Sequence, residues 1–235
     1  MTSETGFALH HTSTWRTLAP TIDLLVREVN LELYRREFPI MKSAVAAHRR
    51  GLINEIAFNV FCSSLALDDT LIWSDNIVSG AVRHASRKIA ALDKIPIEQV
   101  NPPNEIELND CIQQVKRLRA FFLDVRDTIE VLPKFPGAGF IETCEGDVYS
   151  DGTLFEIKAG HRPYKSVDFK QLLTYAALNY ASASRPLDRI GLFNPRMGTS
   201  FVAGLDVIAA EISGCSSVEL LQEIIRVISS GDVSR

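Results

Sequence analysis

The sequence predicts an α/β (α+β) protein in which a helical first half leads into a half that contains a β-sheet. Up to about residue 130, apolar residues recur at helical spacing in long segments. Beyond that point, short apolar or alternating segments are separated by turn signals, and helical segments lie between and after them. We therefore expect a helical region over residues 1–130 and a compact core over residues 131–235.

The helical region should contain four helices. The first begins near Pro20, which is favourable early in a helix, and ends before Pro39. The second spans about 48–65, the third Ser74–Leu92, and the fourth is capped by Asn104. The third helix also carries a basic face, which could follow a phosphate backbone or simply face solvent. This face consists of Arg83, His84, Arg87 and Lys88.

The second half should contain five strands and two helices. A helix is expected from Val167 to about Tyr180, and the capping box Ser216-x-x-Glu219 opens a last helix. The expected strands are Phe140–Cys144, Asp147–Tyr149, Thr153–Lys158, Arg189–Asn194 and Thr199–Ala203.

One strand–turn–strand segment carries the residues with the clearest chemistry. Glu156 and Lys158 are two apart on a strand and therefore project from one face. The turn signal at 150–152 lets the chain double back and brings Asp147 near Glu156. Two converging carboxylates favour a divalent cation such as Mg²⁺, and a lysine beside them can orient water or stabilise a phosphate. This equipment suits hydrolysis of a phosphodiester.

Each of these residues also has a purely structural interpretation. Asp147, Glu156 and Lys158 could form a surface ion-pair ladder across two strands. Asp151 could replace Asp147 as a metal ligand, but its position before Gly152 favours a role in the turn.

A helical face follows this segment. Asp168, Gln171 and Tyr175 lie three and four residues apart and so share one side of the expected helix. Gln171 could contact a phosphate or the attacking water, and Tyr175 could support the lysine or stack on nucleic acid. Both could instead only pack between helix and sheet.

The ordered set Asp147, Glu156-Ile157-Lys158 and Gln171-x-x-x-Tyr175 resembles the PD-(D/E)xK nuclease superfamily. It is most similar to the RecB-type and lambda-exonuclease-like branch, in which a QxxxY helix follows the ExK strand. The similarity covers about a quarter of the chain, 140–196, and Gly146 stands where the family often has proline. The resemblance implies a restriction-endonuclease-like αβββαβ core with a central mixed sheet.

The resemblance also implies the metal site and the catalytic set. Asp147, Glu156 and the Ile157 carbonyl would bind Mg²⁺ or Mn²⁺, and Lys158 would position the attacking water. An acidic residue on an early helix often completes such a site, and Glu55 on the second expected helix is a candidate. A helical projection places Glu55 away from the apolar stripe, so it could equally be a solvated glutamate.

Contacts to nucleic acid must come from local basic residues, because the formal net charge of −4 provides no overall attraction to a polyanion. The best local group lies on and beside the loop after Lys158, and Arg196 is a weaker candidate. The expected nucleic-acid-binding residues are His161, Arg162, Lys165, Lys170 and Arg196.

The remaining expectations concern partners, cofactors and location. The four cysteines are scattered, with no group after Tyr175, so we expect no disulfide framework and no iron–sulfur cluster. Without a signal pattern or a membrane-length apolar run, a cytoplasmic protein is expected.

The sequence thus favours a metal-dependent deoxyribonuclease, with RNA as another possible substrate. The resemblance implies a role in phage defence or repair beside a protein partner, for which an NTPase is one candidate. The alternative is a non-catalytic nuclease-like module that binds nucleic acid or a partner protein. Endo- or exonuclease action, strand preference and oligomeric state are left open by the sequence.

Overall fold

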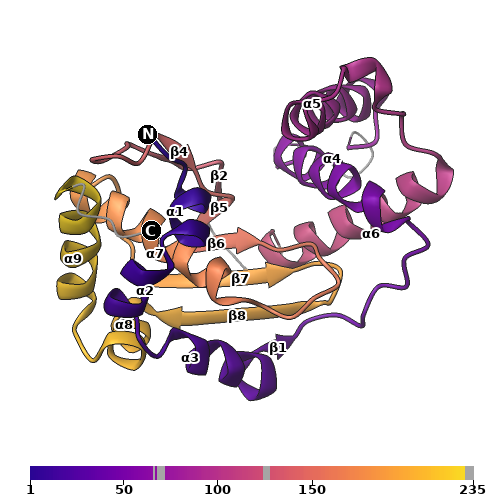
Figure 1. Cartoon of the computed structure of the whole chain (residues 1–235). Coiled ribbons are helices and arrows are strands. Elements are labelled where there is room, and N and C mark those ends of the chain that lie inside the picture. The colour runs from indigo at the N-terminus through magenta and orange to yellow at the C-terminus, as the bar shows by residue number, and fades with distance from the viewer. Residues whose placement is uncertain (66, 68–71, 124–127, 231–235) are drawn as a thin grey trace. The chain divides into compact units, whose positions relative to one another are not determined.

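A computed structural model describes residues 1–65, 67, 72–123 and 128–230 (Figure 1). The chain forms two compact units. The first unit comprises Met1–Glu37, Asp127–Asn194 and Thr199–Arg235, and the second comprises Phe38–Arg126 and Pro195–Gly198. The division therefore differs from the expected boundary near residue 130, because the first 37 residues group with the sheet. None of the helices in the described ranges has the length and apolar character needed to span a bilayer.

The first unit is built on a six-stranded mixed sheet with the strand order β1-β8-β7-β6-β5-β2. The pair β6–β7 is parallel and the other neighbouring pairs are antiparallel. This mixed sheet and its helices confirm the predicted α/β class. The strands are β1 Arg35–Arg36, β2 Glu130–Val131, β5 Val148–Ser150, β6 Thr153–Ile157, β7 Arg189–Asn194 and β8 Thr199–Gly204.

The order β2, β5, β6, helix α7, β7 matches the predicted order of three strands, a helix and a strand; the first three strands are antiparallel and β7 is parallel to β6. The first strand is not the expected Phe140–Cys144, however. Ile141 instead forms isolated bridges with Ala138 and Thr2, because the chain folds closely on itself at Gly137. Only the last residue of the expected strand pairs regularly, in a separate two-stranded ladder of β3 Lys134–Phe135 and β4 Cys144–Glu145.

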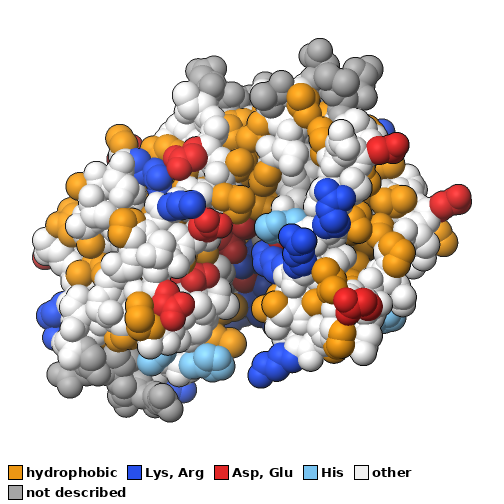
Figure 2. Space-filling model, turned by 90° about the horizontal axis from the view of Figure 1, so that it is seen from above, with side chains coloured by type: hydrophobic (Ala, Val, Ile, Leu, Met, Phe, Trp, Pro, Cys, Tyr) orange, Lys and Arg blue, Asp and Glu red, His pale blue; other side chains and the backbone are white. Residues whose placement is uncertain are grey.

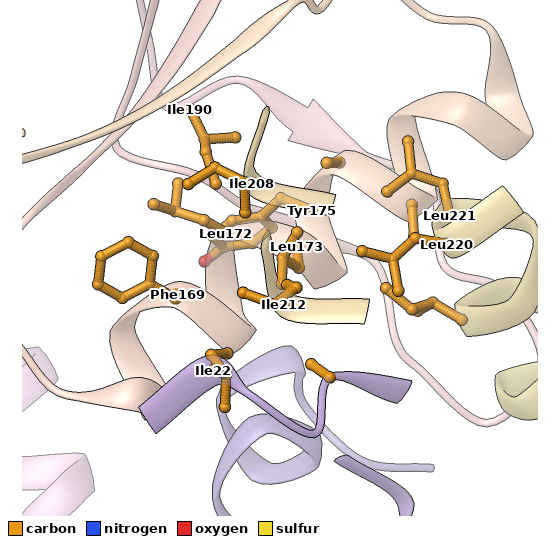
Figure 3. Close-up of a cluster of buried hydrophobic side chains, with 14 of the residues drawn as sticks. Ile22, Phe169, Leu172, Leu173, Tyr175, Ile190, Ile208, Ile212, Leu220 and Leu221 are labelled. Atoms are coloured by element: carbon orange, nitrogen blue, oxygen red, sulfur yellow. The ribbon is translucent and has the colours of Figure 1, made fainter. Parts of the chain in front are cut away.

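Helix α7 links β6 to the parallel strand β7 and is buried along most of its length. Its apolar side chains Phe169, Leu172 and Leu173 meet Ile208, Ile212, Leu220 and Leu221 in the core shown in Figure 3. The helices of this unit are α1 Glu4–His10, α2 Thr12–Leu18, α3 Ile22–Glu28, α7 Ser166–Ser182, α8 Leu205–Ser213 and α9 Ser217–Ser230, with a π-helical turn at Val29–Leu33. The sequence did not predict α1, α2 or α8.

The second unit packs α4 Arg50–Ser63 against α5 Asp75–Asp93 and α6 Glu105–Phe122. All three helices were predicted. Asn104 caps α6 through a reciprocal capping box with Glu107, which satisfies two backbone donors at the start of the helix. Short 3₁₀ turns lie at Ala47–Arg49 and Ile97–Gln99. The core of this unit is formed by Leu52, Ile53, Ile56, Val60, Ala81, Ala85, Cys111 and Val115.

Candidate active site

The β5–β6 hairpin brings Asp147 beside β6. Asp151 and Gly152 have φ values of 47° and 72°, the pair of positive angles that a tight two-residue hairpin turn requires. Val148 then faces Phe155 in the antiparallel register. Asp147, one residue before Val148, accepts a 2.7 Å hydrogen bond from the Ile157 backbone N–H through Oδ2. Strand–turn–strand geometry therefore places the first predicted carboxylate next to the ExK segment.

Asp151 itself serves the turn. Its Oδ1 accepts a 2.7 Å hydrogen bond from the Thr128 hydroxyl. This contact, together with the positive φ, matches the turn interpretation of Asp151 rather than that of a metal ligand.

Glu156 and Lys158 form a buried pair under α7. Lys158 Nζ donates to Glu156 Oε1 at 2.9 Å and to Gln171 Oε1 at 2.8 Å. Asp168 Oδ1 lies 3.8 Å from the same ammonium. Only 8% of the Glu156 side chain and 18% of the Lys158 side chain are exposed. The pair is thus too well buried to be the surface ion-pair ladder that the sequence left open.

Gln171 and Tyr175 extend this network to a residue that the sequence did not single out. Gln171 Nε2 donates to the Tyr175 hydroxyl at 3.0 Å, and the Tyr175 hydroxyl lies 3.2 Å from Glu4 Oε1. Glu4 stands in the first turn of α1, a helix capped by the Ser3 side chain and packed on α7. The Ser3 cap and adjacent acidic residue were the available signal, but a helix of one or two turns gives little periodicity to detect.

The site carries more negative than positive charge. The carboxylates of Glu4, Asp147, Glu156 and Asp168 all influence the titration of Lys158 or Glu156, and Arg162 is the second cation beside them. Burial raises the pKa of Glu156, the charge and hydrogen bond of Lys158 oppose this rise, and the charges of Glu4 and Asp168 add to it. Because the pKa stays raised despite Lys158, a further cation would relieve the electrostatic cost of ionising Glu156.

Lys158 and Tyr175 both stay protonated. Burial opposes the charge on Lys158, but Glu156 and Asp168 outweigh burial and raise the pKa of the ammonium. Burial and the charges of Glu156 and Glu4 raise the pKa of the Tyr175 hydroxyl. Lys158 therefore acts as a fixed positive charge, and Tyr175 as a hydrogen-bond donor.

The donor set fits a hard divalent cation. Glu156 Oε2 is buried and has no hydrogen-bond partner among the described residues, so one carboxylate oxygen is left for a ligand. In the described part of the chain, no three His, Cys, Asp or Glu side chains lie close enough to hold a metal ion together. Asp147 and Glu156 would thus be joined by water or backbone oxygens such as the Ile157 carbonyl, as is usual for Mg²⁺.

The basic loop after Lys158 is held in place by several hydrogen bonds to Asp168. Asp168 accepts two hydrogen bonds from the Arg162 guanidinium, at 2.7 and 2.8 Å, and one from the Lys165 backbone N–H. His161 and the Lys165 side chain are exposed. Lys170 lies with its ammonium 5.9 Å from the centre of the Trp15 ring. Of the predicted contacts to nucleic acid, His161 and Lys165 are thus the most accessible.

Two predicted residues lie in the second unit. Glu55 on α4 receives Lys88 Nζ at 2.8 Å on both carboxylate oxygens. Arg196 is fully buried, and its guanidinium contacts Asp110 at 2.6 Å and Asn54 at 2.8 Å. A side chain with no exposed surface cannot meet a phosphate, so we do not retain Arg196 in the interface. The basic face Arg83, His84, Arg87 and Lys88 on α5 is exposed.

Figure 2 shows Lys and Arg side chains as well as Asp and Glu side chains on one face of the protein. Comparison with known protein families and with curated protein sequences found no match to this chain. The function must therefore be argued from the site itself.

Proposed function

We propose that this protein is a divalent-metal-dependent nuclease of the PD-(D/E)xK type that hydrolyses phosphodiester bonds, with DNA as its substrate class. The observation that carries the proposal is Glu156, a buried carboxylate with one oxygen unpartnered among the described residues, directly beside the charged Lys158. Asp147, the residue before the neighbouring strand β5, supplies the second carboxylate.

Each side chain has a role in this proposal. Asp147 and Glu156 would hold Mg²⁺ or Mn²⁺, which would stabilise charge on the phosphate and lower the pKa of the attacking water. Lys158, fixed by Gln171 and Glu156, presents its positive charge to the phosphate and the water. Tyr175 fixes the amide of Gln171 and also donates to the Glu145 carbonyl, so the lysine keeps one orientation.

The structure gives specific support to one alternative, a nuclease-like module that binds nucleic acid or a protein partner without cleaving. Asp147 Oδ2 is used by the Ile157 N–H and Glu156 Oε1 by Lys158, so part of the carboxylate set is occupied by the protein itself. In the nuclease proposal, the metal ion and substrate reorganise these contacts. In the alternative, the contacts persist and only hold the fold. RNA as substrate is a further variant of the nuclease proposal.

A cleavage assay separates these functions. The full chain is incubated with plasmid, linear duplex, single-stranded DNA and RNA, with Mg²⁺, Mn²⁺ or Ca²⁺. We expect cleavage with Mn²⁺ and Mg²⁺, little with Ca²⁺, and none for Glu156→Gln. Binding of metal by the intact chain without cleavage of any substrate, alone or with partner proteins, would favour the non-catalytic module.

We also propose that a protein partner, such as an NTPase, raises the activity of this chain. The negative net charge predicts weak intrinsic attraction to a polyanion. Rapid, complete digestion by the isolated chain at low enzyme concentration would remove the need for that partner.

A further inference from the structure

The two-residue strand β1 reaches the same end of the sheet as the candidate site. The strand registers form one continuous row across four strands: Ile157 pairs with Phe193, Phe193 with Ser200, and Ser200 with Arg35. Neighbouring strands lie about 4.8 Å apart, so three spacings put β1 roughly 14 Å from the end of β6. Arg35 and Arg36 are both exposed.

The registers also fix the face of the sheet on which the site lies. Glu156 pairs with Leu192, and Leu192 pairs with Phe201, so their side chains share a face. The Phe201 ring lies 5.5 Å from that of Phe169, which identifies this face as the one covered by α7. Gln171 of α7 contacts Lys158 from the same side.

Arg36 belongs to this face and Arg35 to the other. Thr199 stands two residues before Phe201 and pairs with Arg36, so Arg36 shares the face of Glu156. Arg35 pairs with Ser200, and Glu37 on the same side of β1 bonds the Ser200 hydroxyl. Two neighbouring arginines, both exposed, therefore differ in whether they face the site.

The Arg36 side chain is held in place by an aromatic ring. Its Nη2 donates to the Tyr34 hydroxyl at 3.3 Å, and the guanidinium carbon lies 5.6 Å from the centre of the Tyr34 ring. A guanidinium placed against a ring keeps its donors in a fixed orientation, which suits recognition of phosphate.

Strand β8, which pairs with β1, contacts the basic loop through Tyr164. The Tyr164 hydroxyl, from the loop that carries His161 and Lys165, donates to the Thr199 carbonyl at 2.8 Å. The Asn30 amide bonds both the N–H and the carbonyl of Tyr164, which ties the chain just ahead of β1 to the same loop. The loop with exposed His161 and Lys165 is thus joined to the end of the sheet that carries exposed Arg36.

We propose that Arg36, steadied by Tyr34, binds the phosphodiester backbone of the substrate strand at a position remote from the bond that is cut. This inference rests on the proposed nuclease function. A stacked strand rises about 3.4 Å per nucleotide, so a distance of roughly 14 Å corresponds to about four nucleotides beyond the scissile phosphate. The contact is to phosphate and carries no base preference.

The test compares Arg36→Gln with Arg35→Gln. Binding of labelled single-stranded and duplex DNA is measured over a range of salt concentrations with divalent cations chelated, which prevents cleavage. We expect Arg36→Gln to weaken binding several-fold and to lower the salt slope by about one. Arg35→Gln, the same change of charge on the opposite face, should leave both quantities near those of the wild type. Thermal melting checks that both variants are folded.

Substrate length provides a second measurement. In a cleavage assay with Mn²⁺, oligonucleotides are shortened from each end, and the Arg36→Gln defect should disappear once fewer than about four nucleotides remain on one side of the cleaved bond. Equal binding by the two variants, or a defect that is independent of length, would overturn the role of Arg36. A wild-type chain that neither binds nor cleaves any nucleic acid would instead refute the nuclease proposal itself.

Discussion

Each unit contains a buried cluster made of the same three kinds of side chain, and the two clusters are balanced differently. In the second unit, Asp110 contacts Arg196 at 2.6 Å and Gln114 Nε2 at 2.9 Å. In the first unit, Glu156 contacts Lys158, and Lys158 contacts Gln171. Both clusters thus combine a carboxylate, a cation and an amide in a buried setting.

The clusters differ in charge balance and in whether every carboxylate oxygen accepts a hydrogen bond. The Asp110–Arg196 cluster pairs one carboxylate with one guanidinium, and both Asp110 oxygens accept, one from Gln114 and the other from Arg196 Nη1 at 2.8 Å. The Glu156 cluster has an excess of carboxylates and one carboxylate oxygen without a partner among the described residues. Burial of charge alone therefore does not identify a functional site. An excess of one sign with an open coordination position is the more specific indication.

The largest expected effect is on cleavage. Asp147→Asn, Glu156→Gln and Lys158→Met should each reduce the rate by at least about 10²–10³-fold, the scale of losing one preorganised charge or donor in an active site. The rate is measured with linear duplex DNA and Mn²⁺, and circular dichroism checks the fold. Near wild-type cleavage by folded Glu156→Gln would place the chemistry elsewhere.

The second prediction compares the contributions of the two clusters to the stability of the fold. Asp110→Ala leaves Arg196 buried without its carboxylate and should lower the free energy of unfolding by about 3–5 kcal/mol. Glu156→Gln removes an ion that burial disfavours, keeps an amide oxygen as acceptor for Lys158, and leaves Asp168 3.8 Å from that ammonium, so it should lower the free energy of unfolding much less. Urea unfolding without metal measures both variants. A large loss of stability for Glu156→Gln would show that the Glu156 cluster stabilises the fold in the same way as the Asp110 cluster.

The third prediction concerns pH and metal. The pKa of Glu156 is raised in the folded state from its reference value of 4.5, chiefly by burial. The folded state then binds this proton more tightly than the unfolded state does. The stability that this tighter proton binding contributes is fully present below pH 4.5. It is lost as the pH rises through the pKa of Glu156 in the folded state.

A bound cation favours the ionised carboxylate and should cancel this loss. The increase in melting temperature produced by Mg²⁺ should therefore grow as the pH rises above 4.5. The increase should be absent in Glu156→Gln and unchanged in Lys88→Ala, which alters the Glu55 pair in the second unit. An increase that is equal at all pH values would separate metal binding from Glu156.

Local signals predicted much of this site. The Asp151-Gly152 turn, the alternation in β6 and the helix after it place Asp147, Glu156 and Lys158 together without knowledge of distant contacts. These features depend on residues close in the chain, where turn chemistry and periodicity act directly. The capping box of α6 was predictable for the same reason.

Contacts between distant segments were not predictable in this way. Glu4 reaches Tyr175 only because α1 packs on α7, and no pattern near Glu4 encodes that packing. Arg196 follows a proline in a loop and was assigned to the surface, yet Asp110 and Asn54 bury it. The choice of Glu55 as the early-helix carboxylate likewise depended on tertiary placement, and the Glu55 carboxylate accepts from Lys88 and Asn59.

The smallest expected effect is a change in the pKa of a buried thiol on Mg²⁺ binding. One buried cysteine near each cluster reports on it. Burial raises the pKa of Cys144 to about 12, with added effects from Glu4, Glu145 and Glu156. Burial likewise raises the pKa of Cys111 to about 12, where Asp110 and Arg196 act in opposite directions. The two thiols therefore start from similar values but have different charged neighbours.

Mg²⁺ should change the pKa values of the two thiols by different amounts. A cation at the Glu156 cluster offsets the carboxylates that act on Cys144, so the pKa of that thiol should fall modestly, while that of Cys111 should not change. The measurement is the rate of alkylation against pH at each cysteine, followed by mass spectrometry, with exposed Cys215 as the reference for reagent reactivity. Fitting the midpoint of each profile, rather than one rate, separates a change of pKa from a change of access. Equal shifts at both buried thiols, or a shift at Cys111 alone, would mean that the cation acts away from the Glu156 cluster.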